Sequence, residues 1–301
     1  MNYILIDADP IVYRAGFASE ASEYILTLEK GEDDIEQACF LAGENKTAFR
    51  MMLDWLEANP TREVLDTHKI VVAEPVENAL QAVKESINGI LEHVHTPRAL
   101  RFYLSGAGNY RYDLATIKPY KGNRDPTHKP VHYKAIRDYL EEYHHAEVIE
   151  GREADDQISI VASRLRADKE SYVVATIDKD LDQIPGEHYD YMKKVSYAVS
   201  EWSATYWFYT QVLAGDPVDN IAGCYRCGPA KAAKVLANAF TAEHCWEAVV
   251  EEYAEATARS GYPYGDRDTN ELALENARLV YLQREENELW TPPGTPREWM
   301  K

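Results

Sequence analysis

Short apolar runs that end in a carboxylate restrict the fold of this chain more than any other feature. Residues 3–7 (YILID), 99–105 (ALRFYLS) and 171–178 (SYVVATID) are rich in β-forming side chains. Between the last two, residues 156–166 have helical spacing, with Ile158, Val161, Ala162 and Leu165 on one face. Strands that alternate with helices predict an α/β fold built on a parallel sheet.

Two of these predicted strands end in aspartate, Asp7 and Asp178. In open parallel sheets, functional groups gather beyond the carboxyl ends of the strands. We therefore expect Asp7 and Asp178 to lie at one edge of the sheet, on adjacent strands.

The rest of the chain has a different pattern. Residues 20–98 are acidic and have helical spacing, with a stripe that includes Ala79, Val83 and Ile87, and no chemistry is assigned to them. After about residue 200 the pattern is mainly helical. The predicted domains are residues 1–199 and residues 200–301, the second ending in an irregular proline-rich tail.

The charge distribution limits the class of protein. There are 32 Lys and Arg against 51 Asp and Glu, a net charge of −19, which argues against a general nucleic-acid coat protein. Residues 106–134 are the exception, because they are rich in Lys, Arg, Tyr, Gly and Pro and contain only two acids, Asp113 and Asp125. This basic strip predicts local phosphate contacts within an acidic protein.

The N-terminal sequence and the small number of cysteines indicate a reducing compartment. No run of about 18 apolar residues occurs, and the N-terminus lacks the order of a signal peptide, so we expect a cytoplasmic protein. The four cysteines are too few for a disulfide scaffold. Cys224 and Cys227 with His244 and Cys245 could bind zinc, although thiols packed in a turn explain them more simply.

Closely spaced acids recur at three predicted element boundaries: EADD at 153–156, DKDLD at 178–182 and GDPVDN at 215–220. Each alone is typical of a solvated face or a helix N-cap. Together, and with Asp7, they favour a site for hard divalent cations, because carboxylates that converge need a cation or a proton to neutralise them. Two such ions in one site hydrolyse phosphodiesters in many nucleases.

Residues 223–231 (GCYRCGPAK) are predicted to form a hairpin that turns into a helix. Glycines permit close backbone approach, and a helix N-terminus presents free N–H groups to a phosphate, with Lys231 and Lys234 adding charge. A plain turn between two core helices accounts equally well for this motif by itself.

Taken in order, these motifs resemble the structure-specific 5′ nucleases, which comprise flap endonucleases and 5′→3′ exonucleases, and especially their phage-encoded branch. The landmarks are Asp7 followed by Tyr13-Arg14, then YKGNR at 120–124, EADD, DKD and GDPVDN running into GCYRCGPAKA. The resemblance covers most of residues 1–20 and 99–240. It implies a Rossmann-like, PIN-like sheet, a basic helical arch at about 106–145, and a helix-hairpin-helix region.

The resemblance implies an activity and roles for the matching residues. The activity is metal-dependent hydrolysis of DNA at 5′ ends, flaps or gaps, with two Mg²⁺ or Mn²⁺ ions and a K⁺ ion at the hairpin, in the cytoplasm of a bacterial host. Lys121 and Arg124 would steer the scissile phosphate and stabilise its charge. The implied metal ligands are Asp7, Glu153, Asp155, Asp156, Asp178, Asp180, Asp216 and Asp219. The implied DNA contacts are Tyr13, Arg14, Lys118, Tyr120, Gly223, Gly228, Lys231 and Lys234.

The chain departs from the family pattern in three places. Most relatives have an aspartate after the strand that precedes the arch, where this chain has Ser105, and Asp113 is a candidate replacement. Arg226 stands where the hairpin usually has a glycine. Residues 20–98 have no counterpart that we can name.

Three alternatives remain open. Asp7-Ala8-Asp9 after an apolar strand also resembles the opening motif of aspartate-nucleophile phosphohydrolases, in which Asp9 would be essential. A non-catalytic DNA-binding relative would fit the missing aspartate. An RNA-cutting relative is also possible, because contacts to the 2′-OH leave no readable motif.

Overall fold

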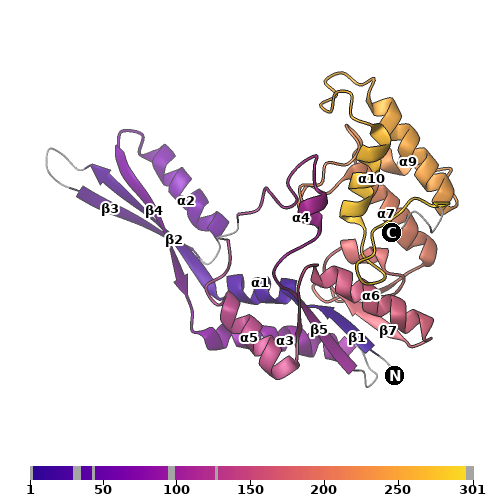
Figure 1. Cartoon of the computed structure of the whole chain (residues 1–301). Helices are drawn as coiled ribbons and strands as arrows, with labels where there is room; N and C mark the ends of the chain where they lie inside the picture. Colours follow the sequence, from indigo (N-terminus) through magenta and orange to yellow (C-terminus); the bar gives the residue numbers. More distant parts are fainter. Residues whose placement is uncertain (1–2, 30–34, 43–44, 94–98, 126–127, 296–301) are drawn as a thin grey trace. The chain divides into compact units, whose positions relative to one another are not determined.

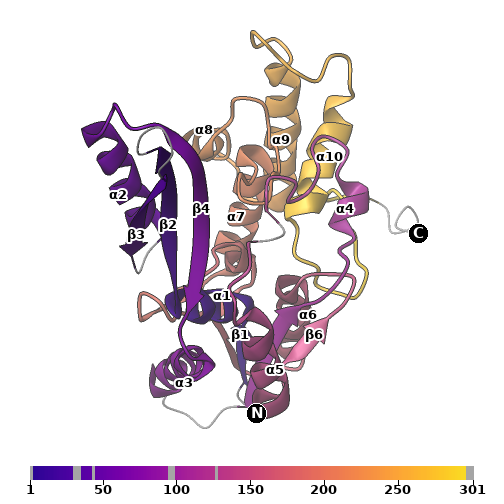
Figure 2. The same cartoon turned by 90° about the vertical axis from the view of Figure 1, so that its left-hand side faces the viewer.

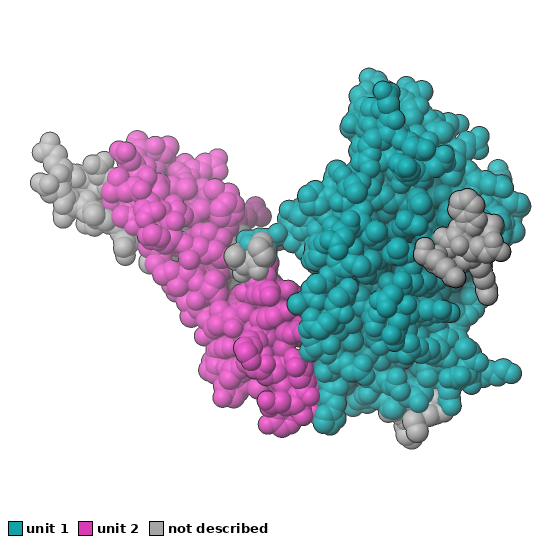
Figure 3. Space-filling view, in the orientation of Figure 1, with its two compact units in different colours: residues 1–9, 90–126, 145–301 teal, residues 10–89, 127–144 magenta. Residues whose placement is uncertain are grey.

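The computed structural model describes residues 3–29, 35–42, 45–93, 99–125 and 128–295. Contacts between residues divide the chain into two units (Figure 3). Unit 1 comprises Met1–Asp9, Ile90–Pro126 and His145–Lys301, and unit 2 comprises Pro10–Gly89 and Thr127–His144. In these described ranges, no helix combines the length and the apolar character needed to cross a membrane. The predicted functional boundary at residue 199 stays a prediction.

Unit 1 is built on a six-stranded sheet of order β6-β5-β1-β7-β8-β9 (Figure 1). Neighbours from β6 to β8 are parallel, and β9 is antiparallel to β8. The strands are β1 (Tyr3–Asp7), β5 (Ala99–Ser105), β6 (Glu147–Ile149), β7 (Tyr172–Ala175), β8 (Gly186–Asp190) and β9 (Val195–Val199). This mostly parallel, helix-flanked sheet confirms the predicted α/β fold.

The core of the sheet explains its apolar strands. Ile4, Leu5 and Ile6 of β1 are all buried, as expected of a central parallel strand covered on both faces. Helix α6 (Ala154–Ala167) packs Ile158 and its apolar neighbours against the sheet, in one cluster with Leu5. The predicted helical stripe at 156–166 is therefore the buried face of α6.

Helices form most of unit 1 after residue 200. They are α7 (Glu201–Ala214), α8 (Pro229–Val235), α9 (Ala242–Ala256) and α10 (Thr269–Val280), and Figure 2 shows α7, α9 and α10 grouped together. Their shared core includes Val212, Val249 and Ala277, and it also takes up Tyr120 from the basic strip. The short helix α4 (Arg111–Leu114) and the 3₁₀ helix η1 (Asp180–Gln183) also belong to unit 1. The mainly helical character predicted after residue 200 is confirmed.

Unit 2 contains a second, antiparallel sheet of order β3-β2-β4. Its strands are β2 (Glu20–Glu29), β3 (Ile35–Ala42) and β4 (Val64–Ala73); α1 (Asp9–Ala18), α2 (Asn45–Ala58) and α5 (Tyr133–His144) also belong to it, and α3 (Val76–His93) spans the boundary between the units. The prediction that residues 20–98 are helical is correct for α2 and α3 but wrong for the three strands.

The physical reason for that error lies in β2. Leu26 and Leu28 alternate along one face of the strand and pack with Met52 of α2. This two-residue period is the strand signal. In β2 this two-residue period is hard to see in the sequence. Only one face of the strand is apolar and buried, and acidic residues lie among the strand's apolar ones.

Candidate metal centre

Asp7 and Asp178 follow adjacent strands, as the sequence predicts. Strands β1 and β7 pair in parallel, and Asp7 is the last residue of β1. The Thr176 hydroxyl, directly after β7, donates to Asp7 Oδ2 at 3.0 Å and accepts from the Asp178 backbone N–H at 3.0 Å. Thr176 therefore fixes both aspartates at the carboxyl edge of the sheet.

The EADD motif opens α6 at the same sheet. Glu153 is the N-cap, and Asp155 and Asp156 lie in the first turn. The Asp156 carboxylate accepts from the Glu153 backbone N–H at 3.3 Å, which completes a capping box with the Glu153 side chain. The helix dipole favours these negative charges at the N-terminus of α6.

The GDPVDN loop folds back on itself. The backbones of Asp216 and Ile221 exchange hydrogen bonds of 3.0 and 2.7 Å, and Asp216 Oδ1 accepts from the Val218 N–H at 2.7 Å. At Gly215 and Gly223 a β-carbon would collide with the facing backbone. The two glycines are therefore required for the tight loop that presents Asp216 and Asp219 together.

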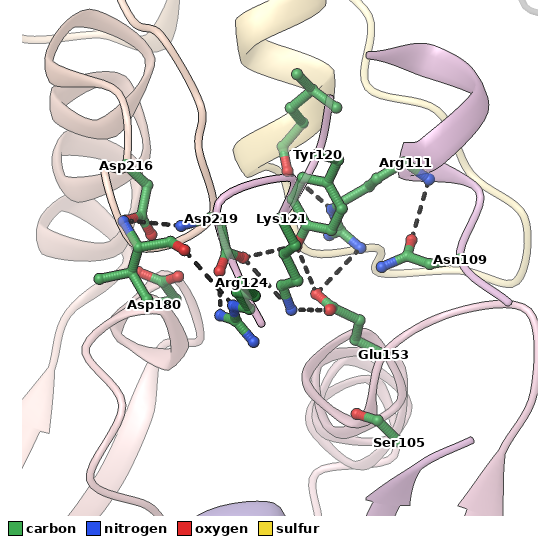
Figure 4. Close-up of polar contacts among 12 residues, drawn as sticks. Ser105, Asn109, Arg111, Tyr120, Lys121, Arg124, Glu153, Asp180, Asp216 and Asp219 are labelled. Carbon is green, nitrogen blue, oxygen red and sulfur yellow. Dashed lines mark hydrogen bonds and ion pairs between the residues drawn. The ribbon is translucent and has the colours of Figure 1, made fainter. Parts of the chain in front are cut away.

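Asp180, Asp216 and Asp219 each offer a carboxylate oxygen, and these oxygens lie within 4.8 Å of one another (Figure 4). Asp180 begins η1, and the Gln211 side chain of α7 donates to its Oδ1 at 2.6 Å. In the described part of the chain, this is the one group of three or more acids, His or Cys with such spacing.

Electrostatics fit a cation at this edge. Burial, then the charges of Asp9 and Asp178, raises the pKa of Asp7 well above its ordinary value. Burial and the charges of Asp7 and Asp178 do the same for the pKa of Asp155. Burial followed by Asp178 and Asp216 raises the pKa of Asp180 to about 8. These carboxylates destabilise one another's ionised forms, which is the condition that a divalent cation relieves.

The basic strip contacts the carboxylates directly (Figure 4). Lys121 Nζ forms an ion pair with Glu153 and lies 3.5 Å from Asp219 Oδ2, and Arg124 forms an ion pair with Asp219. The Tyr120 hydroxyl lies 2.6 Å from Asp219 Oδ2 and 2.8 Å from Glu153 Oε2. Lys121 has a φ of 53°, in the left-handed region that favours glycine.

The predicted arch is divided between the units. Residues 106–126 belong to unit 1, and residues 127–144, with α5, belong to unit 2. The unit 1 part is bonded to α10, because Glu275 accepts from the Thr116 and Ile117 backbone N–H groups, each at 2.7 Å. Lys118 is exposed.

Ser105 fills the position of the missing aspartate. Its hydroxyl accepts from the Ala154 N–H at 3.1 Å, so it binds the first turn of α6. Asp113, the candidate replacement, is exposed on α4 and is not part of the group of three aspartates. The Asp9 carboxylate accepts from the Ser105 N–H at 3.0 Å.

One buried residue of the site was not predicted from the sequence. Arg111 of α4 is 1% exposed and forms a two-pronged ion pair with Asp156. Its signal in the sequence is weak, since it is one of several cations in the basic strip. Asp156, which the resemblance implies as a metal ligand, is thereby engaged with a protein cation.

Of the two predicted hairpin glycines, Gly223 has a left-handed backbone, whereas Gly228 has an ordinary φ of −81°. Gly223 has a φ of 64°, and Gly228 is the N-cap of α8. Arg226 adopts a φ of 56°, so it takes the left-handed conformation although it replaces a glycine. Lys231 Nζ lies 2.8 Å from Glu252 Oε1, whereas Lys234 is exposed.

Tyr13 and Arg14 lie on α1 in unit 2. The Tyr13 ring packs 5.5 Å from that of Tyr133, and Arg14 is exposed. Their implied contact with DNA stays a prediction.

The alternative zinc site is not assembled in the described part of the chain. Cys224, Cys227 and Cys245 are buried in the helical core, and His244 is exposed. No group of Cys and His with ligand spacing occurs among the described residues.

No family model matches this chain. Among solved structures, the 5′-exonuclease of bacteriophage T5 with divalent metal ions (zinc) is similar over 93% of this chain and 89% of that one, at 13% identity and a TM-score of 0.53. A mutant of the T5 5′-exonuclease matches over 93% and 88%, at 12% identity and a TM-score of 0.48. A complex of the T5 flap endonuclease with DNA and metal ions matches over 67% and 80%, at 15% identity and a TM-score of 0.47. The first of these likenesses shows that the chain has the fold of the T5 5′-exonuclease, as the resemblance predicts.

Proposed function

We propose that this protein is a metal-dependent 5′ nuclease that hydrolyses DNA phosphodiesters at 5′ ends or flap junctions. The observation that carries the proposal is the juxtaposition, within unit 1, of a carboxylate group with two basic side chains. Asp180, Asp216 and Asp219 provide the oxygens, and Lys121 and Arg124 lie against the same group. This combination binds cations and phosphate side by side.

The donor set suits Mg²⁺ or Mn²⁺, since it consists of carboxylate oxygens. Asp7, Glu153 and Asp155 would hold one ion and Asp180, Asp216 and Asp219 a second. Asp178 is the candidate shared ligand, because its charge raises the pKa values of Asp7, Asp155 and Asp180. Two such ions activate a water molecule and stabilise the leaving oxygen of an in-line displacement.

Lys121 and Arg124 supply the positive charge for the scissile phosphate. In the protein alone, they neutralise Glu153 and Asp219. Burial would raise the pKa of Glu153, but the charges of Lys121 and Arg111 outweigh burial and lower it. When divalent cations take over these carboxylates, the ammonium and guanidinium groups become available to phosphate oxygens, Lys as a point charge and Arg as a fork.

DNA is the substrate that fits best. Arg14, Lys118 and Lys234 are exposed cations that can contact phosphates, and such contacts select structure rather than sequence. The T5 structures in complex with metal ions or DNA support the same assignment for a chain of this fold. Removal of DNA from 5′ ends during phage replication would use this activity.

The decisive experiment is cleavage of a 5′-labelled flap duplex and of a matching blunt duplex in Mg²⁺, in Mn²⁺ and in EDTA. The test variant is Asp178→Ala, and its matched control is Asp182→Asn in the same motif, whose Oδ1 accepts from the Tyr197 hydroxyl at 2.8 Å. We expect metal-dependent cutting that D178A abolishes and D182N retains. The product lengths separate flap cutting from exonuclease action.

The same assay separates the alternatives. Binding without cutting in either metal would sink the nuclease proposal and favour a DNA-binding relative, and faster cutting of a matched RNA flap would favour an RNA nuclease. A phosphohydrolase would lose all activity in an Asp9→Asn variant, because Asp9 would take part in the chemistry. In the structure Asp9 bonds the Ser105 backbone, so we expect D9N to retain nuclease activity.

A further inference from the structure

We propose that Arg111 is a positioning residue of the nuclease site and that Asp156 is its partner rather than a metal ligand. The proposal rests on the nuclease function proposed above, and it reassigns one acid of the EADD motif. It follows from how completely the hydrogen-bonding capacity of both side chains is used.

The carboxylate of Asp156 has no remaining capacity for a metal ion. An ionised carboxylate offers about four lone-pair directions. Asp156 Oδ2 accepts from Arg111 Nη1 at 2.6 Å and from the Glu153 N–H at 3.3 Å. Its Oδ1 accepts from Arg111 Nη2 at 2.9 Å and from the Gln283 N–H at 3.1 Å. With four donors and 0% exposure, Asp156 is a fully bonded buried anion.

The guanidinium of Arg111 uses four of its five N–H donors. Besides Asp156, its Nε donates to the Leu279 carbonyl at 2.8 Å and its Nη2 to the Tyr281 carbonyl at 2.7 Å, at the end of α10. The cation also lies over the Tyr110 ring, 4.7 Å from its centroid. Arg111 therefore joins three chain segments: the basic strip, the start of α6 and the end of α10.

This junction orients the candidate ligands next to it. Asp156 holds the Glu153 backbone through the capping box, and Arg111 Nη1 lies 3.8 Å from Glu153 Oε2. Asp155 lies directly before Asp156 in the first turn of α6. The Arg111–Asp156 pair thus fixes the helix turn that carries Glu153 and Asp155, and the charges of Asp7 and Asp178 act on Asp155.

The first test is a double-mutant cycle on thermal unfolding in EDTA, with Arg111→Met, Asp156→Asn and the double variant. Each single change leaves a buried group unpaired, and we expect each to lower the unfolding temperature by at least about 5 °C. The double variant removes both charges and is expected to regain part of that loss. Strictly additive losses would refute the pairing.

The second test measures Mn²⁺ affinity by electron paramagnetic resonance, which reports metal binding without catalysis. The conservative Arg111→Lys variant keeps the charge but loses the fork, and we expect Mn²⁺ affinity to weaken about 10-fold, as for other supporting residues. The matched control is Arg267→Lys, whose partner Glu275 also lies on α10 and is itself no metal-ligand candidate. We expect that control to bind Mn²⁺ as the wild type does.

Variants of Asp156 distinguish a partner of Arg111 from a metal ligand. If it is a partner, adding Asp156→Asn to Arg111→Met restores Mn²⁺ affinity relative to Arg111→Met alone, and Asp155→Asn weakens binding more than Asp156→Asn does. If Asp156→Asn abolishes Mn²⁺ binding as fully as Asp155→Asn while the protein stays folded, Asp156 is a ligand and the proposal fails. Failure of the wild type to cut DNA would overturn the nuclease function alone, because neither measurement here depends on cleavage.

Discussion

The two ends of the carboxylate site differ in how the negative charge of their aspartates is neutralised. At the α6 end, Asp156 is fully buried and bonded to the fixed cation of Arg111. At the other end, Asp180, Asp216 and Asp219 lie together, and among the described residues only Asp219 of the three is paired with basic side chains. All four aspartates belong to the short acidic motifs of the sequence. What distinguishes them is whether the protein itself supplies the neutralising charge.

The difference shows in the pKa values. The pKa of Asp180 rises to about 8 through burial and the charges of Asp178 and Asp216, so ionising it carries a free-energy cost that the Gln211 hydrogen bond offsets only in part. A diffusible divalent cation would offset that cost, whereas the Arg111 end is complete without one. The contrast therefore separates a carboxylate that the protein neutralises with its own cation from those proposed to bind a metal ion.

The largest effect is expected from Asp180→Asn. If this end binds a catalytic ion, losing a ligand removes several kcal/mol of transition-state stabilisation, and flap cutting in Mg²⁺ should fall by about 1000-fold or more. Rates from single-turnover assays at saturating protein check this. A loss of less than about tenfold, equivalent to 1.4 kcal/mol, would mean that Asp180 holds no catalytic ion.

The next effect is expected from Lys121→Ala. Because its ammonium lies between Glu153 and Asp219, its removal should lower the cutting rate by about 100-fold, as for a group that stabilises transition-state charge. Lys193→Ala is the matched control in unit 1, since Lys193 is an exposed lysine paired with Asp190. Equal losses in both variants would indicate a general charge effect instead.

A third effect concerns stability and pH in EDTA. The folded-state pKa of Asp180, about 8, exceeds its ordinary value of 3.8, so the folded protein holds a proton that the unfolded chain releases. That stabilisation is fully present below about pH 4 and is lost as pH rises through about 8. We expect the unfolding temperature to fall between pH 5 and 8, and less steeply in Asp180→Asn or with Mg²⁺. If neither change altered the slope of unfolding temperature against pH, Asp180 would not have the raised pKa on which this prediction rests.

The smallest effect separates two lysines of α8. Lys231 is already paired with Glu252 at 2.8 Å, whereas Lys234 is exposed. Lys234→Ala should lower the slope of log affinity against log salt for duplex DNA by about 1, and Lys231→Ala by less. Fluorescence anisotropy at several salt concentrations measures both slopes. The reverse order would show that DNA displaces Glu252 from Lys231.

The parallel sheet could be predicted because its signal is local. The runs at 3–7 and 99–105 coincide with β1 and β5, since central strands need continuous apolar sequence. The third run overshoots β7, which ends at Ala175, because Thr176 turns its hydroxyl to Asp7 and Asp178. The antiparallel sheet of unit 2 was missed because its alternation lies within acidic sequence.

Only the residues of the site that lie in short sequence motifs could be predicted. EADD, DKD and GDPVDN carry their acids in short patterns, and the structure groups Asp180 with Asp216 and Asp219. Arg111 has no such pattern. Its partner Asp156 is 45 residues away, and its other acceptors are the carbonyls of Leu279 and Tyr281, 168 and 170 residues away. Backbone acceptors are the same at every residue, so no sequence reading could select them.

Lys121 combines a strained backbone with a charge that the site uses. A non-glycine residue with a φ of 53° is strained, and strain of this kind costs on the order of 1 kcal/mol. Glycine at residue 121 would relax the backbone, but it would also remove the ammonium group that offsets the burial of Glu153, and an unpaired buried charge costs more than this strain. Lys121→Gly and Lys121→Ala both remove the ammonium group, and only glycine relaxes the backbone, so the difference between their unfolding temperatures measures the strain by itself.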